Sequence, residues 1–124
     1  MTYFDEYGFG DRYDIHIVKE EIDFAINIDL QHHLNSRIGE YYSLSIPAVG
    51  YNIFKLRYNK ICDEDGWFLQ YRDFPDHVLI LLTWSESLET IDEYRDKLIA
   101  NTNAKFLSRK EIKLRSFIVN NKAS

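Results

Sequence analysis

The longest run of apolar residues occupies residues 77–84, with the sequence His-Val-Leu-Ile-Leu-Leu-Thr-Trp. Turn-forming residues flank this run, with Pro75 before it and Ser85 after it. An unbroken apolar run of this length between turn residues predicts a strand that is buried on both faces. As the last strand of a simple meander it would lie at an exposed edge, which its composition does not suit. We therefore expect a further element beside it, either an N-terminal strand or the C-terminal segment.

Apolar and polar residues alternate through much of the remaining chain, as is typical of strands with one buried face. Together with the apolar run, this pattern predicts six strands, at residues 14–18, 22–30, 41–46, 51–59, 67–72 and 77–84. Connections of about four to six residues favour antiparallel hairpins between them. Residues 1–13 are predicted to form a loop or arm, and residues 32–36 a polar break. The polar positions predict one solvated side of the sheet, carrying Asp23, Asn27, Asp29, Ser43, Ser45, Lys55, Arg57, Gln70 and Arg72.

Residues 22–30 admit two interpretations. Every second residue in this segment is apolar, which predicts a strand. A series of apolar residues four apart also begins at Val18 and continues to Leu34, which is the spacing of one helix face. We prefer the strand, because a helix would leave Phe24 and Ile28 outside that apolar stripe.

Two helices are predicted in the last third of the chain. Ser87 is placed to cap a helix over residues 88–100, where apolar residues recur at helical spacing. Ser108 and Glu111 have the spacing of a capping box, which favours a second helix over residues 109–120. The same segment also alternates between apolar and polar residues, so a strand that lies next to residues 77–84 is the alternative.

These elements predict an α+β fold, with a mostly antiparallel sheet of five to six strands packed by two helices. The length suits a single domain, residues 1–124. Because Cys62 is the only cysteine, an internal disulfide and a zinc site built on cysteines are excluded. No apolar run approaches the roughly 20 residues that cross a membrane, and no secretion signal follows Met1. We expect a cytoplasmic protein without membrane association.

Charge is distributed unevenly along the chain. Residues 105–124 hold six basic residues and one acidic residue, a net charge of +5, and residues 1–104 hold nine basic and nineteen acidic residues, a net charge of −10. An acidic body favours a basic partner and disfavours anionic membranes and nucleic acids. We therefore expect no nucleic-acid partner, although the basic C-terminal segment could touch phosphates.

No set of residues points to catalysis or to a cofactor. The four histidines are His16, His32, His33 and His77. The adjacent pair would point to opposite faces of a strand, which prevents both from binding one metal ion. Cys62 lacks the basic neighbour that a nucleophilic cysteine needs. We predict no catalytic residue, no metal site and no cofactor.

Two acidic clusters are the candidate partner-binding residues. The first lies in a predicted hairpin turn and comprises Asp63, Glu64 and Asp65. The second lies on the exposed face of the predicted helix and comprises Glu86, Glu89, Asp92, Glu93 and Asp96. Clusters of this kind attract a basic protein and accelerate its association. The alternative is that both clusters are merely solvated.

The expected function is non-enzymatic protein binding. An acidic surface rich in aromatic residues suits an immunity or antitoxin type of protein, which binds and neutralises a basic, nuclease-like toxin domain in bacteria. One alternative is a small enzyme whose site is assembled in space from the dispersed histidines and carboxylates. Another is a regulatory module that binds a small ligand under Trp67 or Trp84. The sequence leaves open whether the protein is a monomer or a dimer.

Overall fold

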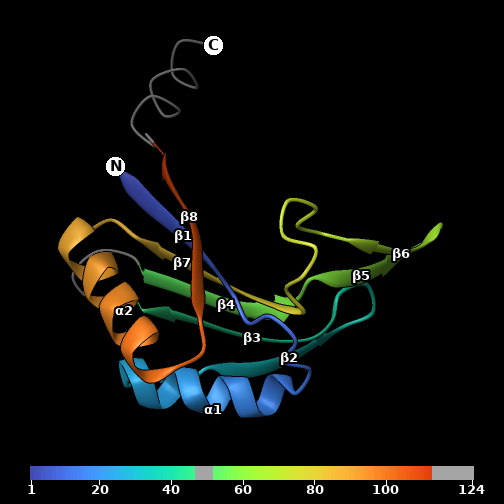
Figure 1. The fold of residues 1–124 in the computed structure, drawn as a ribbon, viewed down its shortest axis with the longest axis horizontal. Helices are drawn as coiled ribbons and strands as arrows, with labels where there is room; N and C mark the ends of the chain where they lie inside the picture. The colour runs from blue at the N-terminus through green and yellow to red at the C-terminus, as the bar shows by residue number, and fades with distance from the viewer. Residues whose placement is uncertain (47–51, 113–124) are drawn as a thin grey trace, which may run out of the picture.

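The protein has an α+β fold, in which two helices cover one face of a six-stranded antiparallel sheet (Figure 1). The structure is a computed structural model that describes residues 1–46 and 52–112. The predicted fold class is therefore confirmed. The strand order is β2-β3-β4-β7-β1-β8. The strands of this sheet are β1 (Thr2–Gly8), β2 (Gln31–Asn35), β3 (Gly39–Ile46), β4 (Asn52–Tyr58), β7 (Leu79–Ser85) and β8 (Lys105–Ile112).

The apolar strand β7 lies in the middle of the sheet, between β4 and β1. Leu81 is opposite Leu56 of β4 and Tyr7 of β1, and all three side chains are buried. This arrangement confirms both the strand and the predicted additional neighbour. That neighbour is β1, so the loop predicted for residues 1–13 is wrong over Thr2–Gly8.

Strand β1 was hidden in the sequence because buried carboxylates interrupt its apolar pattern. Asp5 and Glu6 point to opposite faces of the sheet, and each is almost completely buried. Cations from β8 compensate them: Arg109 binds Asp5 through two nitrogens, at 2.7 and 2.8 Å, and Lys110 lies 3.2 Å from Glu6. Because the partners lie about a hundred positions away, the local sequence of β1 resembles an exposed arm.

The helix α1 (Ile15–Ile26) replaces the strands predicted at residues 14–18 and 22–30. Asp14 caps it by accepting bonds from the backbone N–H groups of His16 and Ile17. The helix ends at Asn27, which adopts the left-handed conformation with φ of 57°. Its buried residues follow the four-residue spacing that was the alternative interpretation, namely Ile15, Val18, Ile22 and Ile26. The cap at Asp14 and this apolar stripe stabilise a helix here, although alternate residues of 22–30 are apolar as in a strand. The side chain of Phe24 is therefore left in solvent.

The second helix, α2 (Leu88–Asn101), confirms the prediction for residues 88–100, with Ser87 accepting a bond from the Thr90 N–H group. The helix predicted at residues 109–120 is wrong over residues 109–112, which belong to strand β8, and residues 113–120 lie outside the described part. Ser108 does not cap a helix, since its hydroxyl donates to Glu6 at 3.0 Å. The strand pairs with β1, not with β7 as the alternative had it.

Two other strand predictions need correction. Residues 67–72 were expected in the main sheet, but only Gly66–Leu69 form a strand, β6, which pairs with β5 (Lys60–Asp63) in a separate hairpin. Residues 32–36, expected to be a break, fall mostly in β2, the edge strand. All five of its side chains are exposed and only Leu34 is apolar, so the sequence shows no apolar alternation and the pairing with β3 defines the strand. The predictions for β3 and β4 are confirmed within two residues at the described ends.

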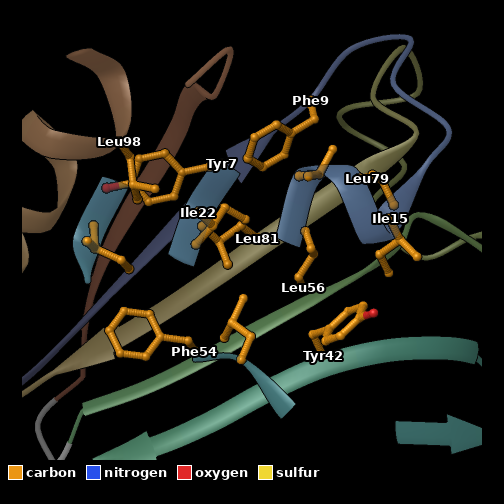
Figure 2. Close-up of a cluster of buried hydrophobic side chains, with 13 residues drawn as sticks. Tyr7, Phe9, Ile15, Ile22, Tyr42, Phe54, Leu56, Leu79, Leu81 and Leu98 are labelled. Carbon is orange, nitrogen blue, oxygen red and sulfur yellow. The ribbon is translucent and has the colours of Figure 1, made fainter. Parts of the chain in front are cut away.

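The hydrophobic core lies between the helices and one face of the sheet. Figure 2 shows Ile22 of α1 and Leu98 of α2 next to the side chains of Tyr7, Phe54 and Leu81. The opposite face, here called the helix-free face, carries four residues of the predicted polar side: Ser43, Ser45, Lys55 and Arg57. The other five predicted residues lie outside the main sheet, because they belong to α1, to the α1–β2 loop or to residues 70–78.

Candidate functional site

Negative charge is concentrated on the layer formed by the two helices. Residues 11–35, which contain α1, hold six acidic and two basic residues, and residues 86–101, which contain α2, hold five acidic and two basic residues. Both helices lie on the same face of the sheet (Figure 1). Net charges of −4 and −3 are therefore brought together, although the two segments are about fifty residues apart in sequence. We call this surface the acidic helical layer.

Within this layer the outer face of α1 exposes large apolar side chains. Phe24 is 87% exposed and Ile17 is 50% exposed. They stand seven residues apart, so they lie on the same side of the helix, with the exposed Glu20 between them. The prediction of a strand concealed this face. The four-residue apolar spacing could have located it, because Ile17 and Phe24 stand outside that stripe.

The basic residues of α1 and its preceding loop are already bound to carboxylates. The Lys19 ammonium lies 2.6 Å from Asp23 and 3.2 Å from Asp29. The hydrogen bond with Asp23 raises the pKa of Lys19, so this cation stays charged and paired. Arg12 binds Glu21 at 2.9 Å. Neither cation is therefore available to repel a basic partner.

The predicted acidic residues of α2 have different surroundings. Four of them are exposed, namely Glu86, Glu89, Glu93 and Asp96. Asp92 is partly buried and accepts a bond from Arg109 at 2.6 Å, which links α2 to β8. It therefore contributes to the fold. Glu93 is paired with Lys97 at 2.8 Å, so Glu86 and Glu89 offer the less compensated negative charge.

The predicted acidic cluster of the hairpin turn does not lie next to the cluster on α2. Asp63 ends β5, and Glu64 and Asp65 follow in the hairpin turn, where both are exposed. Helix α2 lies at the left of Figure 1, whereas the β5–β6 hairpin projects from the right. Because the clusters lie at opposite ends of the molecule, a small partner domain cannot be centred on both.

Two basic side chains lie on the face of the sheet that the helices do not cover. Lys55 and Arg57 of β4 lie on the helix-free face, opposite Leu82 and Ile80 of β7. Burial lowers the pKa of both side chains, and Arg57 lowers that of Lys55 further. Within the described residues, Arg57 Nε is buried without a hydrogen-bond partner. The sheet therefore separates an acidic side from a side that carries neighbouring cations.

Two of the four histidines come together, at the junction of α1 with the edge of the sheet. Nε2 of His16 and Nε2 of His32 lie 3.5 and 3.4 Å from the two carboxylate oxygens of Glu40. Nδ1 of His16 also bonds the Tyr42 hydroxyl at 2.5 Å. Across residues 1–46 and 52–112, however, no three histidine, cysteine or acidic side chains are arranged to hold a metal ion. These bonds attach the start of α1 to strands β2 and β3.

The remaining histidines lie elsewhere. His33 stacks on Tyr41, with ring centroids 4.9 Å apart. His77 accepts a bond from the Gly10 N–H group at 2.9 Å and lines a cleft of about 570 Å³ at the end of the sheet. The enzyme hypothesis required the histidines to converge with carboxylates, and the structure brings together only His16 and His32, both about half exposed.

The comparisons with known proteins identify no relative. No family model matches this chain, and no curated protein sequence matches it. Among the described residues, no helix is long and apolar enough to cross a membrane. The functional argument therefore depends on the surfaces of the molecule.

Proposed function

We propose that this protein is a non-enzymatic binding protein whose acidic helical layer docks on a basic protein partner. In its specific form, the proposal is an immunity-type protein that neutralises a cationic, nuclease-like toxin domain. The observation that carries it is the exposed phenyl ring of Phe24 on a helix surrounded by carboxylates. A large aromatic side chain within a charged rim is the usual composition of an interface centre.

The apolar and charged parts of this surface have separate roles. Covering a phenylalanine side chain contributes about 2–3 kcal/mol to binding before the costs of association. Ile17 extends the same apolar strip by two helical turns. The surrounding acids, such as Glu20 and Glu89, accelerate association with a basic surface by long-range attraction. A nuclease cleft is cationic because it binds phosphates, so it offers the complementary charge.

Charge reversal tests the electrostatic part of the proposal. The first step is to isolate the partner from the source cell, identify it by mass spectrometry and purify it. Glu20→Lys is then combined with Glu89→Lys in the acidic protein, since both side chains are exposed. We expect association with the partner to slow by about tenfold or more at low salt, and the difference to shrink as salt is added. The matched control combines Glu64→Lys with Asp76→Lys, which changes the charge equally away from the helices.

Truncation of the aromatic ring tests the apolar part. Phe24→Ala removes almost no buried area from the free protein, so its stability should remain within about 0.5 kcal/mol of the unchanged protein. We expect it to weaken binding by about tenfold or more, mainly through faster dissociation. A partner without a basic surface would contradict the proposal. Equal effects of the helical and control reversals would also contradict it.

A further inference from the structure

The cleft at the end of the sheet is a cavity formed by described residues from five segments of the chain. It has a volume of about 570 Å³, within the range of small-molecule sites. It lies between the β2–β3 turn, the β5–β6 hairpin and the segment that precedes β7. From these features we propose that the cleft binds a small planar ligand that carries a negative charge. Partner docking on the acidic helical layer is a separate matter, since no residue of helix α1 or α2 lines the cleft.

Aromatic rings on the rim provide the planar part of the recognition. Tyr13 is 73% exposed and Trp67 is 68% exposed, and Tyr58 lines the interior. The Tyr58 hydroxyl donates to the Tyr13 carbonyl at 3.3 Å, which connects two of the three ring-bearing residues. Leaving an indole and a phenol largely in water is unfavourable, and a flat ligand ring stacked on either side chain would cover part of its apolar surface.

The charged groups of the cleft have one sign. Arg37 and Lys60 line it, and no aspartate or glutamate occurs among the described residues of its wall. The Lys60 ammonium lies 5.7 Å from the centre of the Trp67 ring, so a cation and a stacking surface are adjacent. This local positive charge occurs in a chain with a net charge of −5.

Neither cation belongs to an ion pair among the side chains that the structure describes, which excludes residues 47–51, 62, 63 and 113–124. Six of the other ten basic side chains of this part have a carboxylate oxygen within 4.0 Å, and four do not. The six are Arg12, Lys19, Arg95, Lys97, Arg109 and Lys110, and the four are Lys55, Arg57, Arg72 and Lys105. What distinguishes Arg37 and Lys60 is that they lack a carboxylate partner among the described side chains and also line the same cleft. An anionic group on a ligand would complete their pairing.

The histidine of the wall, His77, is also a hydrogen-bond donor. Since Nδ1 of His77 accepts the Gly10 N–H bond, the neutral ring must carry its proton on Nε2. Burial, followed by repulsion from Lys105, lowers the pKa of His77 and favours this neutral form. The imidazole therefore has a single N–H donor left to offer, which again suits a ligand with acceptor atoms.

The cleft is preformed, because buried hydrogen bonds fix its wall. Nδ2 of Asn59 donates to the carbonyl oxygens of Phe74 and His77 at 3.0 Å each. Oδ1 of the same side chain accepts a bond from the Tyr71 N–H group at 2.7 Å. The segment that carries Pro75 and His77 is thereby attached to the end of β4, so binding needs little ordering of the chain.

The test uses two matched pairs of probes, each a planar ring with and without an anionic group. The pairs are adenosine monophosphate with adenosine, and indole-3-acetate with indole-3-ethanol. Binding to the full-length protein is followed by backbone amide chemical shifts in nuclear magnetic resonance titrations. We expect at least one anion to bind with a dissociation constant below about 1 mM and about tenfold more tightly than its neutral counterpart. The shifts should cluster at residues 36–39, 58–60, 67–69 and 75–78.

Two variants assign the binding to this cleft. Trp67→Ala and Arg37→Ala should each weaken the anion by about tenfold, whereas Arg72→Ala, an exposed arginine outside the wall, should not. Urea unfolding of each variant verifies the fold. If neither anion binds below about 1 mM, or if the neutral probes bind equally well, the proposal is overturned. Unchanged affinity in both variants also overturns the proposal of an anion-binding cleft. This result does not depend on whether Phe24→Ala weakens binding of the protein partner.

Discussion

Replacing Asn59 by alanine is the most direct test of the fold around the cleft. The side chain is buried and holds residues 71–77 by bonds in both directions. Its loss leaves the Tyr71 N–H group and the His77 carbonyl without their partners, while the Phe74 carbonyl keeps a bond from the His77 N–H group. The contact with the Tyr71 carbonyl, at 3.5 Å, is too long to count. Three lost bonds at about 1 kcal/mol each predict a loss of about 3 kcal/mol of unfolding free energy.

Urea denaturation measures this loss, and amide hydrogen exchange locates it. We expect the Tyr71 amide to exchange much faster in Asn59→Ala, because no acceptor replaces Oδ1. Asn59→Asp keeps that acceptor but places a carboxylate among carbonyl oxygens, so it should be no more stable than the alanine variant at neutral pH. Asn103→Ala, in the exposed turn after α2, is the control. If Asn59→Ala lowers the unfolding free energy by less than about 0.5 kcal/mol, the three hydrogen bonds of Asn59 do not stabilise the fold as argued.

Two further predictions concern buried ionisable groups. Asp5→Asn should cost about 2–3 kcal/mol of unfolding free energy in urea denaturation, because it removes the charge that Arg109 binds through two nitrogens; an unchanged midpoint would contradict this. The pKa of His77 lies below its ordinary value of 6.5, so its contribution to stability is complete above that pH and is lost as the pH falls below it. Comparing the unfolding free energies of the unchanged protein and His77→Gln between about pH 7.5 and pH 5 isolates this loss, and parallel curves would contradict it.

The predictable elements were those whose determinants are local. The apolar run of β7 indicates burial whatever its neighbours are, and Ser87 with the following apolar spacing defines α2. Short connections made β3 and β4 an antiparallel pair. The α+β class followed from these elements alone.

The elements that were missed depend on distant partners, or have apolar residues that fit both the two-residue spacing of a strand and the four-residue spacing of a helix. Strand β1 contains Asp5 and Glu6, whose burial is possible only because β8 supplies Arg109 and Lys110. In the sequence such carboxylates indicate solvent. Helix α1 satisfies both the two-residue and the four-residue pattern, and only the cap at Asp14 favours the helix locally.

The candidate sites were missed for related reasons. Phe24 became an interface candidate only when α1 was a helix, since in a strand it would have belonged to the buried face. The cleft combines residues from five separate segments. Of these residues, only Trp67 was named for a small-ligand site, and that site was expected on the sheet face and not at the end of the sheet. Spacing along the chain cannot report such proximity, because the connections between those segments determine it.

The cations of β8 leave most of the acidic helical layer uncompensated, since Asp92 is the one acidic residue of α2 with which the structure pairs a cation of β8. Of the cations in β8, Lys110 lies on the helix-free face, where it compensates the buried Glu6. Arg109 faces the helices, but Asp5 takes two of its nitrogens and Asp92 takes the third. These cations therefore stabilise the fold from within, and Glu20 and Glu89 keep their charge towards solvent. A basic partner would meet a surface whose own counter-charges are already bound.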